Sequence, residues 1–139
     1  MGWYQAIQNS DDVPRIVWHI CPKSHWNDKC MEYVPKAYDE DKFTRASHMP
    51  EKLMETANCF YKDDKEMDWV CLQIDTSGLS FHGIEVTMEA SITDPELKCP
   101  KIFGGIPRGA INKVYDVQRA EDGSFVFVKG LTDQCTTKK

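Results

Sequence analysis

Residues 69–75 read Trp-Val-Cys-Leu-Gln-Ile-Asp, and this nearly continuous apolar run decides the fold class. A strand with one exposed face alternates apolar and polar residues, whereas a strand that is covered on both faces is apolar almost throughout. The run therefore predicts a central strand that packs on both of its faces. The charged segment 62–68 precedes this strand and is typical of an exposed connection.

Two helices are predicted on the N-terminal side of this strand. Over residues 50–61, apolar residues fall at i, i+1, i+4, i+7 and i+8, which is one face of an α-helix, and Pro50 suits its first turn. An earlier helix is predicted from Ser24, as the N-cap, through Met31 to a stop at Pro35.

Two further strands follow from residue type and from alternation with a period of two. In residues 84–90 the side chains of Glu85, Thr87 and Glu89 share one face, while the apolar residues between them face the core. Residues 15–20 read Arg-Ile-Val-Trp-His-Ile, a β-branched and aromatic run that predicts the first strand.

Short strands at residues 42–46 and 101–103 and a C-terminal hairpin over residues 111–129 complete the secondary structure. The hairpin turns at an Asp-Gly pair, which favours a tight turn. Two helices among six or seven strands make an α+β protein. The length of 139 residues predicts a single domain over residues 1–139, with a frayed tail at residues 132–139.

Composition argues against several classes of partner. Hydrophobic residues make up 41% and charged residues 28%, which is close to the average of a soluble globular domain. Lys and Arg number 17 and Asp and Glu number 22, and the net charge of -5 argues against nucleic acid and against an anionic membrane as partners. No apolar run is long enough to span a membrane, and the N-terminal residues lack the pattern of a secretion signal, so we expect a cytoplasmic protein. Its six cysteines are then expected to be reduced, the alternative being an oxidised set in a secreted protein.

Several motifs could carry chemistry, and each has a simpler interpretation. The spacing His-x-Cys-x3-His-x4-Cys over residues 19–30 has the ligand types of a zinc site, but a strand followed by a helix does not bring the four together, so no metal is expected. The glycine-rich stretch 104–109 lacks the Lys-Ser/Thr of a phosphate loop and is interpreted as a turn. Glu85 and Glu89 could accept hydrogen bonds from the hydroxyl groups of a ribose, or they could simply face solvent. His19, inside an apolar strand, could serve a site or the fold.

The order of several short motifs resembles the family called domain of unknown function 952, over residues 15–117. The motifs are Ile16-Val17-Trp18-His19-Ile20, Trp26, Phe43-Thr44-Arg45-Ala46-Ser47, the helix with Thr56-Ala57 and Phe60, Val70-Cys71-Leu72, Glu89-Ala90-Ser91 and Pro100-Lys101-Ile102-Phe103. Members of that family are similar in fold to ADP-ribosyltransferases. The resemblance therefore implies a split, curved, mostly antiparallel β-sheet core around a cleft that holds NAD in true enzymes.

The resemblance also implies roles for individual residues. His19 takes the place of a histidine that orients a ribose, and Glu89 that of a glutamate that stabilises positive charge at the anomeric carbon, so these two are the candidate catalytic residues. Two histidines of the family's cleft are replaced here by Arg45 and Lys101, which stay charged at pH 7 and suit an anionic ligand. The candidate ligand-binding residues are Trp18, Arg45, Ser47, Lys101 and Phe103.

We therefore expect a cleft that binds an anionic, nucleotide-like ligand, NAD or ADP-ribose, with ADP-ribosyl transfer or NAD glycohydrolysis as the reaction if the protein is an enzyme. The alternative is a non-catalytic binding module, or pseudoenzyme, that has lost the family's cleft histidines. A third interpretation is an interaction protein whose partner surface uses Trp3 and Tyr4. The sequence leaves the oligomeric state open.

Overall fold

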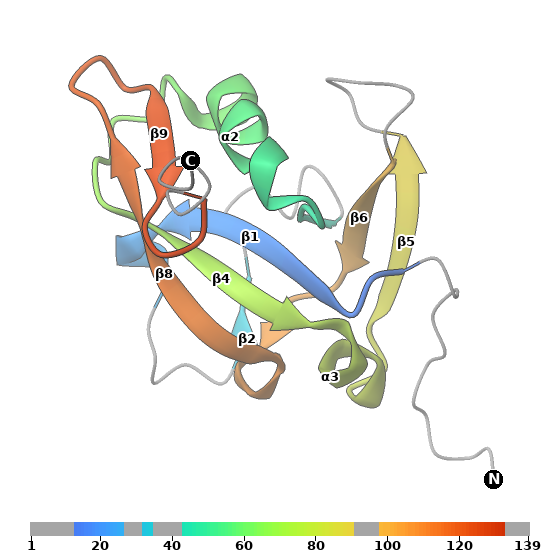
Figure 1. Ribbon diagram of the computed structural model, residues 1–139. Coiled ribbons are helices and arrows are strands. Elements are labelled where there is room, and N and C mark those ends of the chain that lie inside the picture. Colours follow the sequence, from blue (N-terminus) through green and yellow to red (C-terminus); the bar gives the residue numbers. More distant parts are fainter. Residues whose placement is uncertain (1–12, 27–31, 35–42, 91–97, 133–139) are drawn as a thin grey trace, which may run out of the picture.

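A computed structural model describes residues 13–26, 32–34, 43–90 and 98–132 of the chain (Figure 1). The strands are β1 (Ile16–Pro22), β2 (Glu32–Tyr33), β3 (Thr44–Arg45), β4 (Trp69–Asp75), β5 (Glu85–Ala90), β6 (Lys98–Phe103), β7 (Ile106–Pro107), β8 (Ile111–Arg119) and β9 (Phe125–Val128). The helices are α2 (Leu53–Tyr61) and α3 (Thr76–Phe81), with short 3-10 helices η1 (Lys23–His25), η2 (Pro50–Lys52) and η3 (Arg108–Ala110). The predicted α+β class is confirmed.

The strands form a curled antiparallel arrangement that is split into sheets. One sheet has four strands in the order β1-β4-β8-β9, a second has three in the order β3-β6-β5, and β2 pairs with β7. Figure 1 shows β5 and β6 standing to one side of the four-stranded sheet, with α2 above β1. A bridge connects β1 to the segment that follows β3, because the backbone groups of Trp18 and Ser47 exchange two hydrogen bonds of 2.8 Å.

The central strand is β4, and it is buried on both faces as its apolar run predicts. Trp69 and Cys71 belong to a hydrophobic cluster that lies under α2 and continues into β9. Val70, Leu72 and Ile74 alternate with them and belong to a second cluster, which includes residues of α3, β5 and β6. All five side chains are at most 3% exposed.

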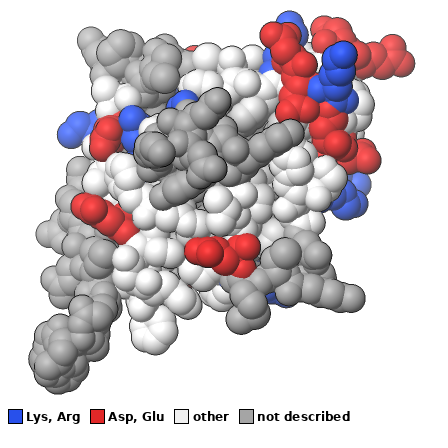
Figure 2. Space-filling model, turned by 180° about the vertical axis from the view of Figure 1, so that it is seen from behind, with Lys and Arg blue, Asp and Glu red and all other residues white. Residues whose placement is uncertain are grey.

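The predicted helix at residues 50–61 is confirmed as η2 followed by α2, with Leu53 and Ala57 buried on its inner face. The hairpin of β8 and β9 is also present, with Val117 opposite Val128. The connection 62–68 is largely exposed. Figure 2 shows acidic and basic side chains crowded at one corner of the molecule, where Figure 1 places this connection and the β8–β9 turn.

The prediction of a helix from Ser24 to Pro35 is wrong. The only helical turn among the described residues of this stretch is η1, which ends at His25, and the backbone of the next residue, Trp26, is extended. Glu32 and Tyr33 form β2 instead, because Tyr33 is buried in the core at 5% exposure and its strand pairs with β7. Tertiary burial of the tyrosine therefore outweighs the local helical pattern.

The helix α3 was not predicted. Asp75 caps it by accepting a hydrogen bond of 2.9 Å from the backbone N–H of Ser77, which is the usual N-cap arrangement. A Cβ added at Gly78 would lie 3.1 Å from Ala110, so the glycine permits α3 to pack closely against η3. The stretch 104–109, predicted to be a turn, contains β7 and the start of η3.

Several predictions lie outside the described residues. These are the roles of Trp3 and Tyr4, the positions of Cys30 and Cys135, and the frayed tail beyond residue 132. None of the helices in the described part of the chain is long and apolar enough to cross a membrane.

Candidate functional site

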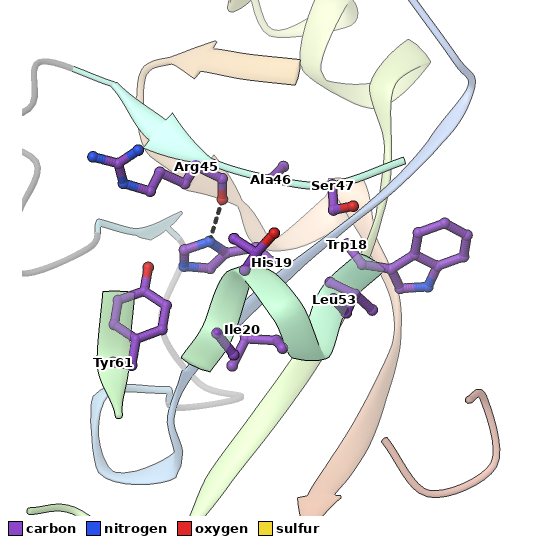
Figure 3. A pocket seen from close by; sticks show the side chains of 10 residues that line it. Trp18, His19, Ile20, Arg45, Ala46, Ser47, Leu53 and Tyr61 are labelled. Atoms are coloured by element: carbon purple, nitrogen blue, oxygen red, sulfur yellow. Dashed lines mark hydrogen bonds between the residues drawn. The ribbon is translucent and has the colours of Figure 1, made fainter. Parts of the chain in front are cut away.

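A groove runs between α2 and the strands β1, β3 and β6, and it consists of two adjoining pockets. We call the first the His19 pocket, and it contains about 290 Å³ of space free of atoms, part of it open to solvent. Its lining consists of Trp18, His19, Ile20, Arg45, Ala46, Ser47, Leu53, Thr56, Ala57 and Tyr61 (Figure 3). The second, the Lys101 pocket, contains about 390 Å³; it is lined by Phe43, Arg45, Ala46, Thr56, Phe60, Ala90, Cys99, Pro100 and Lys101. Arg45, Ala46 and Thr56 belong to both, so the two pockets share a wall.

His19 is buried at the base of the His19 pocket, with only 3% of its surface exposed. Its Nδ1 lies 2.6 Å from the carbonyl oxygen of Arg45, shown by the dashed line in Figure 3. A carbonyl oxygen can only accept, so Nδ1 carries the proton and donates it. Nε2 then accepts from the hydroxyl of Tyr33 over a longer distance of 3.4 Å. Both ring nitrogens of His19 are therefore engaged inside the protein.

Burial also fixes the charge of His19 and its neighbours. Desolvation lowers the pKa of His19 to about 4, against the smaller opposing effect of the hydrogen bond to Arg45, so the ring is neutral at pH 7. Desolvation raises the pKa of the Cys21 thiol to about 12 and that of the Tyr33 phenol above its usual range. This interior cluster is therefore uncharged at pH 7, and a hydrogen bond from His19 to a ribose would require it to give up one of its present partners.

Ser47 and Trp18 also line the His19 pocket, but their polar atoms serve the fold. The Ser47 hydroxyl donates to the carbonyl of Met49 and accepts from the N–H of Met49, each at 3.2 Å, which forms the turn before η2. The indole N–H of Trp18 donates to the side chain of Gln73 at 3.2 Å. Figure 3 shows this indole directed away from the pocket.

Arg45 and Lys101 are brought together at the Lys101 pocket. They lie directly opposite each other on the paired strands β3 and β6, so their side chains share one face of the sheet. The Arg45 guanidinium lies 4.0 Å from the ring centre of Phe60 and 5.2 Å from that of Phe43, and the Lys101 ammonium lies 4.5 Å from the ring centre of Phe43. The two cations are thus held side by side over aromatic rings, which attract positive charge.

Glu89 lies beside this cationic pair and outside the lining of either pocket. Its Oε1 is 3.2 Å from the Lys101 ammonium, and its Oε2 accepts a hydrogen bond of 2.8 Å from the Thr87 hydroxyl. The hydrogen bond from Thr87 and then the contact with Lys101 lower the pKa of Glu89, so it is charged at pH 7. The structure therefore places the two candidate catalytic residues at different parts of the groove, with His19 inside one pocket and Glu89 at the rim of the other.

Phe103 is the seventh candidate, and it also lies beside the groove. It is two residues along β6 from Lys101, on the same face, and its side chain is 38% exposed. Its ring makes an edge contact with Phe43, at 6.2 Å between ring centres. Of the sequence candidates, the groove is lined by Trp18, His19, Arg45, Ser47 and Lys101.

Several residues of the groove were not among the sequence candidates. Those with polar or aromatic side chains at the Lys101 pocket are Phe43, Thr56, Phe60 and Cys99. The alternation of β3 and β6 could have indicated two of them, because Phe43 and Cys99 each lie two residues before a predicted cation. The helical pattern assigned Phe60 to the core, whereas it supports the Arg45 guanidinium at the groove.

Three of the four suggested metal ligands, His19, Cys21 and His25, lie in the described part of the chain. His19 is buried, His25 is exposed on η1, and Cys30 lies outside the described residues. Within residues 13–26, 32–34, 43–90 and 98–132, no group of three or more His, Cys, Asp or Glu side chains is placed to hold a metal ion. Four thiols in this part of the chain are unpaired: Cys21, Cys59, Cys71 and Cys99.

The order of motifs along the chain and the curled sheet that they form agree with one known family. The profile of the family described as "Protein of unknown function (DUF952)" matches residues 20–114, which is more than half of the chain. The chain belongs to this family. Among curated proteins, none matches the chain.

Solved structures support the fold of this DUF952 protein. The crystal structure of protein CC0527 from Caulobacter crescentus is similar, with a TM-score of 0.63, 17% sequence identity, and coverage of 80% of this chain and 93% of that chain. A double mutant of the same Caulobacter protein matches to the same extent. At this identity the likeness concerns the fold alone.

Proposed function

We propose that this DUF952 protein binds an anionic, nucleotide-like ligand such as ADP-ribose or NAD in the groove, and that it acts as a binding module. The observation that carries the proposal is the pairing of Arg45 with Lys101 across β3 and β6. Two adjacent cations can meet two oxygens of a phosphate or diphosphate, and such charge-assisted hydrogen bonds are among the stronger polar contacts in proteins. The rings of Phe43 and Phe60 hold both cations in place before a ligand arrives.

The shape of the groove supports a ligand with two parts. The two pockets share Arg45, Ala46 and Thr56, so one ligand can extend from the first pocket into the second. The His19 pocket has largely apolar walls, and its polar groups at His19 and Ser47 already have partners. It therefore suits a flat, weakly polar ring, while the phosphates of the same ligand lie across Arg45 toward Lys101.

Binding without turnover accounts best for the positions of the candidate catalytic residues. In an ADP-ribosyl transfer or glycohydrolase reaction, a carboxylate must stand at the anomeric carbon and stabilise positive charge there. Glu89 instead faces Lys101 and is held by Thr87, outside the lining of the groove. His19 is neutral and fully engaged in the interior.

Calorimetric titration with ADP-ribose and with NAD tests the proposal. Arg45→Ala removes a charge-assisted contact of about 1.5 to 3 kcal/mol, so we expect affinity to fall about tenfold to a hundredfold. Lys101→Ala should weaken binding in the same direction, and higher salt should weaken binding to the wild-type protein. Arg108→Ala and Lys129→Ala are matched controls, because both side chains are exposed and lie outside the groove, and they should bind like the wild type.

Three results would contradict the proposal. If neither ligand binds, or if Arg45→Ala binds as well as Arg108→Ala, the groove is not an anion site. The NAD sample should also be assayed for free nicotinamide after the titration. Release of nicotinamide by the wild type that Glu89→Gln abolishes would make the protein an enzyme and would overturn the binding-module interpretation.

A further inference from the structure

The cationic pair of the groove already has an anion beside it, which is part of the protein itself. We propose that Glu89 is an internal competitor for Lys101: its carboxylate contacts the ammonium and must release it when a phosphate binds. This inference rests on the proposed anion site. It assigns Glu89 the role of a specificity residue, because an incoming anion binds Lys101 only if its interaction with the ammonium is more favourable than that of the Glu89 carboxylate.

The contacts around Glu89 position its carboxylate as a substitute ligand. Thr87 lies directly opposite Lys101 on the paired strands β5 and β6, and Glu89 follows two residues later on the same face. The Thr87 hydroxyl fixes Oε2 at 2.8 Å, and this leaves Oε1 directed at the ammonium, 3.2 Å away. One carboxylate oxygen therefore occupies the place that a phosphate oxygen would take on Lys101.

The exposure of the two partners shows how the exchange can occur. The side chain of Glu89 is 45% exposed and that of Lys101 only 25%, so the carboxylate lies on the solvent side of the pair. On release, Glu89 can turn into water without leaving a buried charge behind, which would be costly. Lys101 stays beside Phe43 and Arg45, ready for the incoming anion.

The competition also favours particular ligands. A singly charged carboxylate gains little by replacing another carboxylate on Lys101. A diphosphate carries more charge than the Glu89 carboxylate and can contact Lys101 and Arg45 together. The site should therefore prefer diphosphates over monocarboxylates, and this preference should shrink when Glu89 is neutralised.

The size of the effect follows from the nature of the ion pair. Exposed pairs of this kind are weak, which corresponds to about a twofold to fivefold change in an equilibrium constant, and the repulsion between Glu89 and a bound phosphate adds to it. We expect Glu89→Gln to bind ADP-ribose about threefold to tenfold more tightly than the wild type. This is opposite in sign to the loss expected for a carboxylate that contacts the substrate.

The experiment is calorimetric titration of ADP-ribose into the full chain and its variants. Glu85→Gln is the matched control, because Glu85 lies on the same strand face but opposite Phe103, and it should bind like the wild type. Thr87→Val frees Oε2 and should give a smaller gain than Glu89→Gln. In a Lys101→Ala background the gain from Glu89→Gln should fall, because the released ammonium is absent.

The outcomes separate this inference from the proposed function. Tighter binding by Glu89→Gln, and not by Glu85→Gln, supports the competition. If the wild type binds and Glu89→Gln binds equally or more weakly, the competition is contradicted while the anion site stands. If no variant binds ADP-ribose although thermal melting shows that all are folded, the proposed function fails and this inference fails with it.

Discussion

Arg119 in the four-stranded sheet and Lys101 in the three-stranded sheet have different kinds of hydrogen-bonding partner. Arg119, in the four-stranded sheet, is 5% exposed, and its guanidinium donates to carbonyl oxygens of the backbone, among them those of Gly123 at 2.9 Å and Lys62 at 2.8 Å. It also donates to the carbonyls of Tyr61 and Glu66 and lies 4.4 Å from the ring centre of Phe125. The ammonium of Lys101, in the three-stranded sheet, meets the half-exposed side chain of Glu89 instead.

This difference separates polar groups that build the fold from polar groups that are available to a ligand. Backbone carbonyls cannot move away without unfolding the loops that contain them, so Arg119 ties the connection after α2 to the β8–β9 turn. At Gly123, where φ is +95°, an added Cβ would come within 2.8 Å of the Lys62 carbonyl, so the turn fits closely against that connection. A side-chain partner such as Glu89 can turn away at little cost.

The strongest test of the comparison is Arg119→Met. The substitution keeps an unbranched apolar stem but leaves several buried carbonyl oxygens without a donor, and each costs about 1 to 3 kcal/mol. Because water can reach some of them after relaxation, we expect the free energy of unfolding to fall by roughly 3 to 5 kcal/mol. Urea unfolding measures it.

Arg108→Met is the control for this test, because Arg108 is exposed, and its stability should change by no more than about 0.5 kcal/mol. A loss below about 1 kcal/mol in Arg119→Met would show that the guanidinium is not needed by the fold. The contrast between the two sheets would then be wrong.

The second test uses the pH dependence that comes from His19. Its pKa is about 4 in the folded protein and near 6.5 when unfolded, so between these values the unfolded chain binds more protons. Stability is therefore fully present above pH 6.5 and is lost as the pH falls toward 4. At 1.36 kcal/mol per unit of pKa, the loss from this residue is about 3 kcal/mol.

Urea unfolding at pH 7, 5.5 and 4.5 measures this loss in the wild type and in His19→Asn. The asparagine amide can still donate to the Arg45 carbonyl, but it does not titrate. We expect the two proteins to differ most at pH 7 and to converge as the pH falls. Parallel pH profiles would show that His19 is not a buried neutral residue and would reopen its assignment to ligand chemistry.

The sequence predicts those helices and strands whose residue pattern is complete within one short segment. The apolar run of β4 and the helical spacing of α2 are each visible within about ten residues, and both are confirmed. Tyr33 is different, because its burial depends on pairing with β7, which lies some seventy residues away in the sequence. The residues around Tyr33 do not indicate this pairing. The missed helix α3 did have a local signal in the Asp75 cap, but it is only six residues long.

The site was predictable as a set of residues but not as an arrangement. Alternation placed Glu85, Thr87 and Glu89 on one face, and the resemblance drew attention to Arg45 and Lys101. Which of these meet depends on the register between strands that are far apart in sequence. That register sets Lys101 against both Arg45 and Thr87. The bridge between Trp18 and Ser47 brings the Arg45 carbonyl close to His19, and this carbonyl decides which ring nitrogen carries the proton.

The smallest expected effect concerns the stability of the ion pair at the groove. Lys101→Ala removes a partly exposed ion pair, and ion pairs near the surface contribute about 0.2 to 1 kcal/mol, so we expect the free energy of unfolding to change by less than about 1 kcal/mol. The same variant should lose affinity for ADP-ribose. The comparison with Arg119 predicts that Lys101 contributes to ligand binding but contributes little to the stability of the fold. If Lys101→Ala instead destabilises the protein as strongly as Arg119→Met, then both cations hold the fold together, and the three-stranded sheet has no exchangeable charge to offer a ligand.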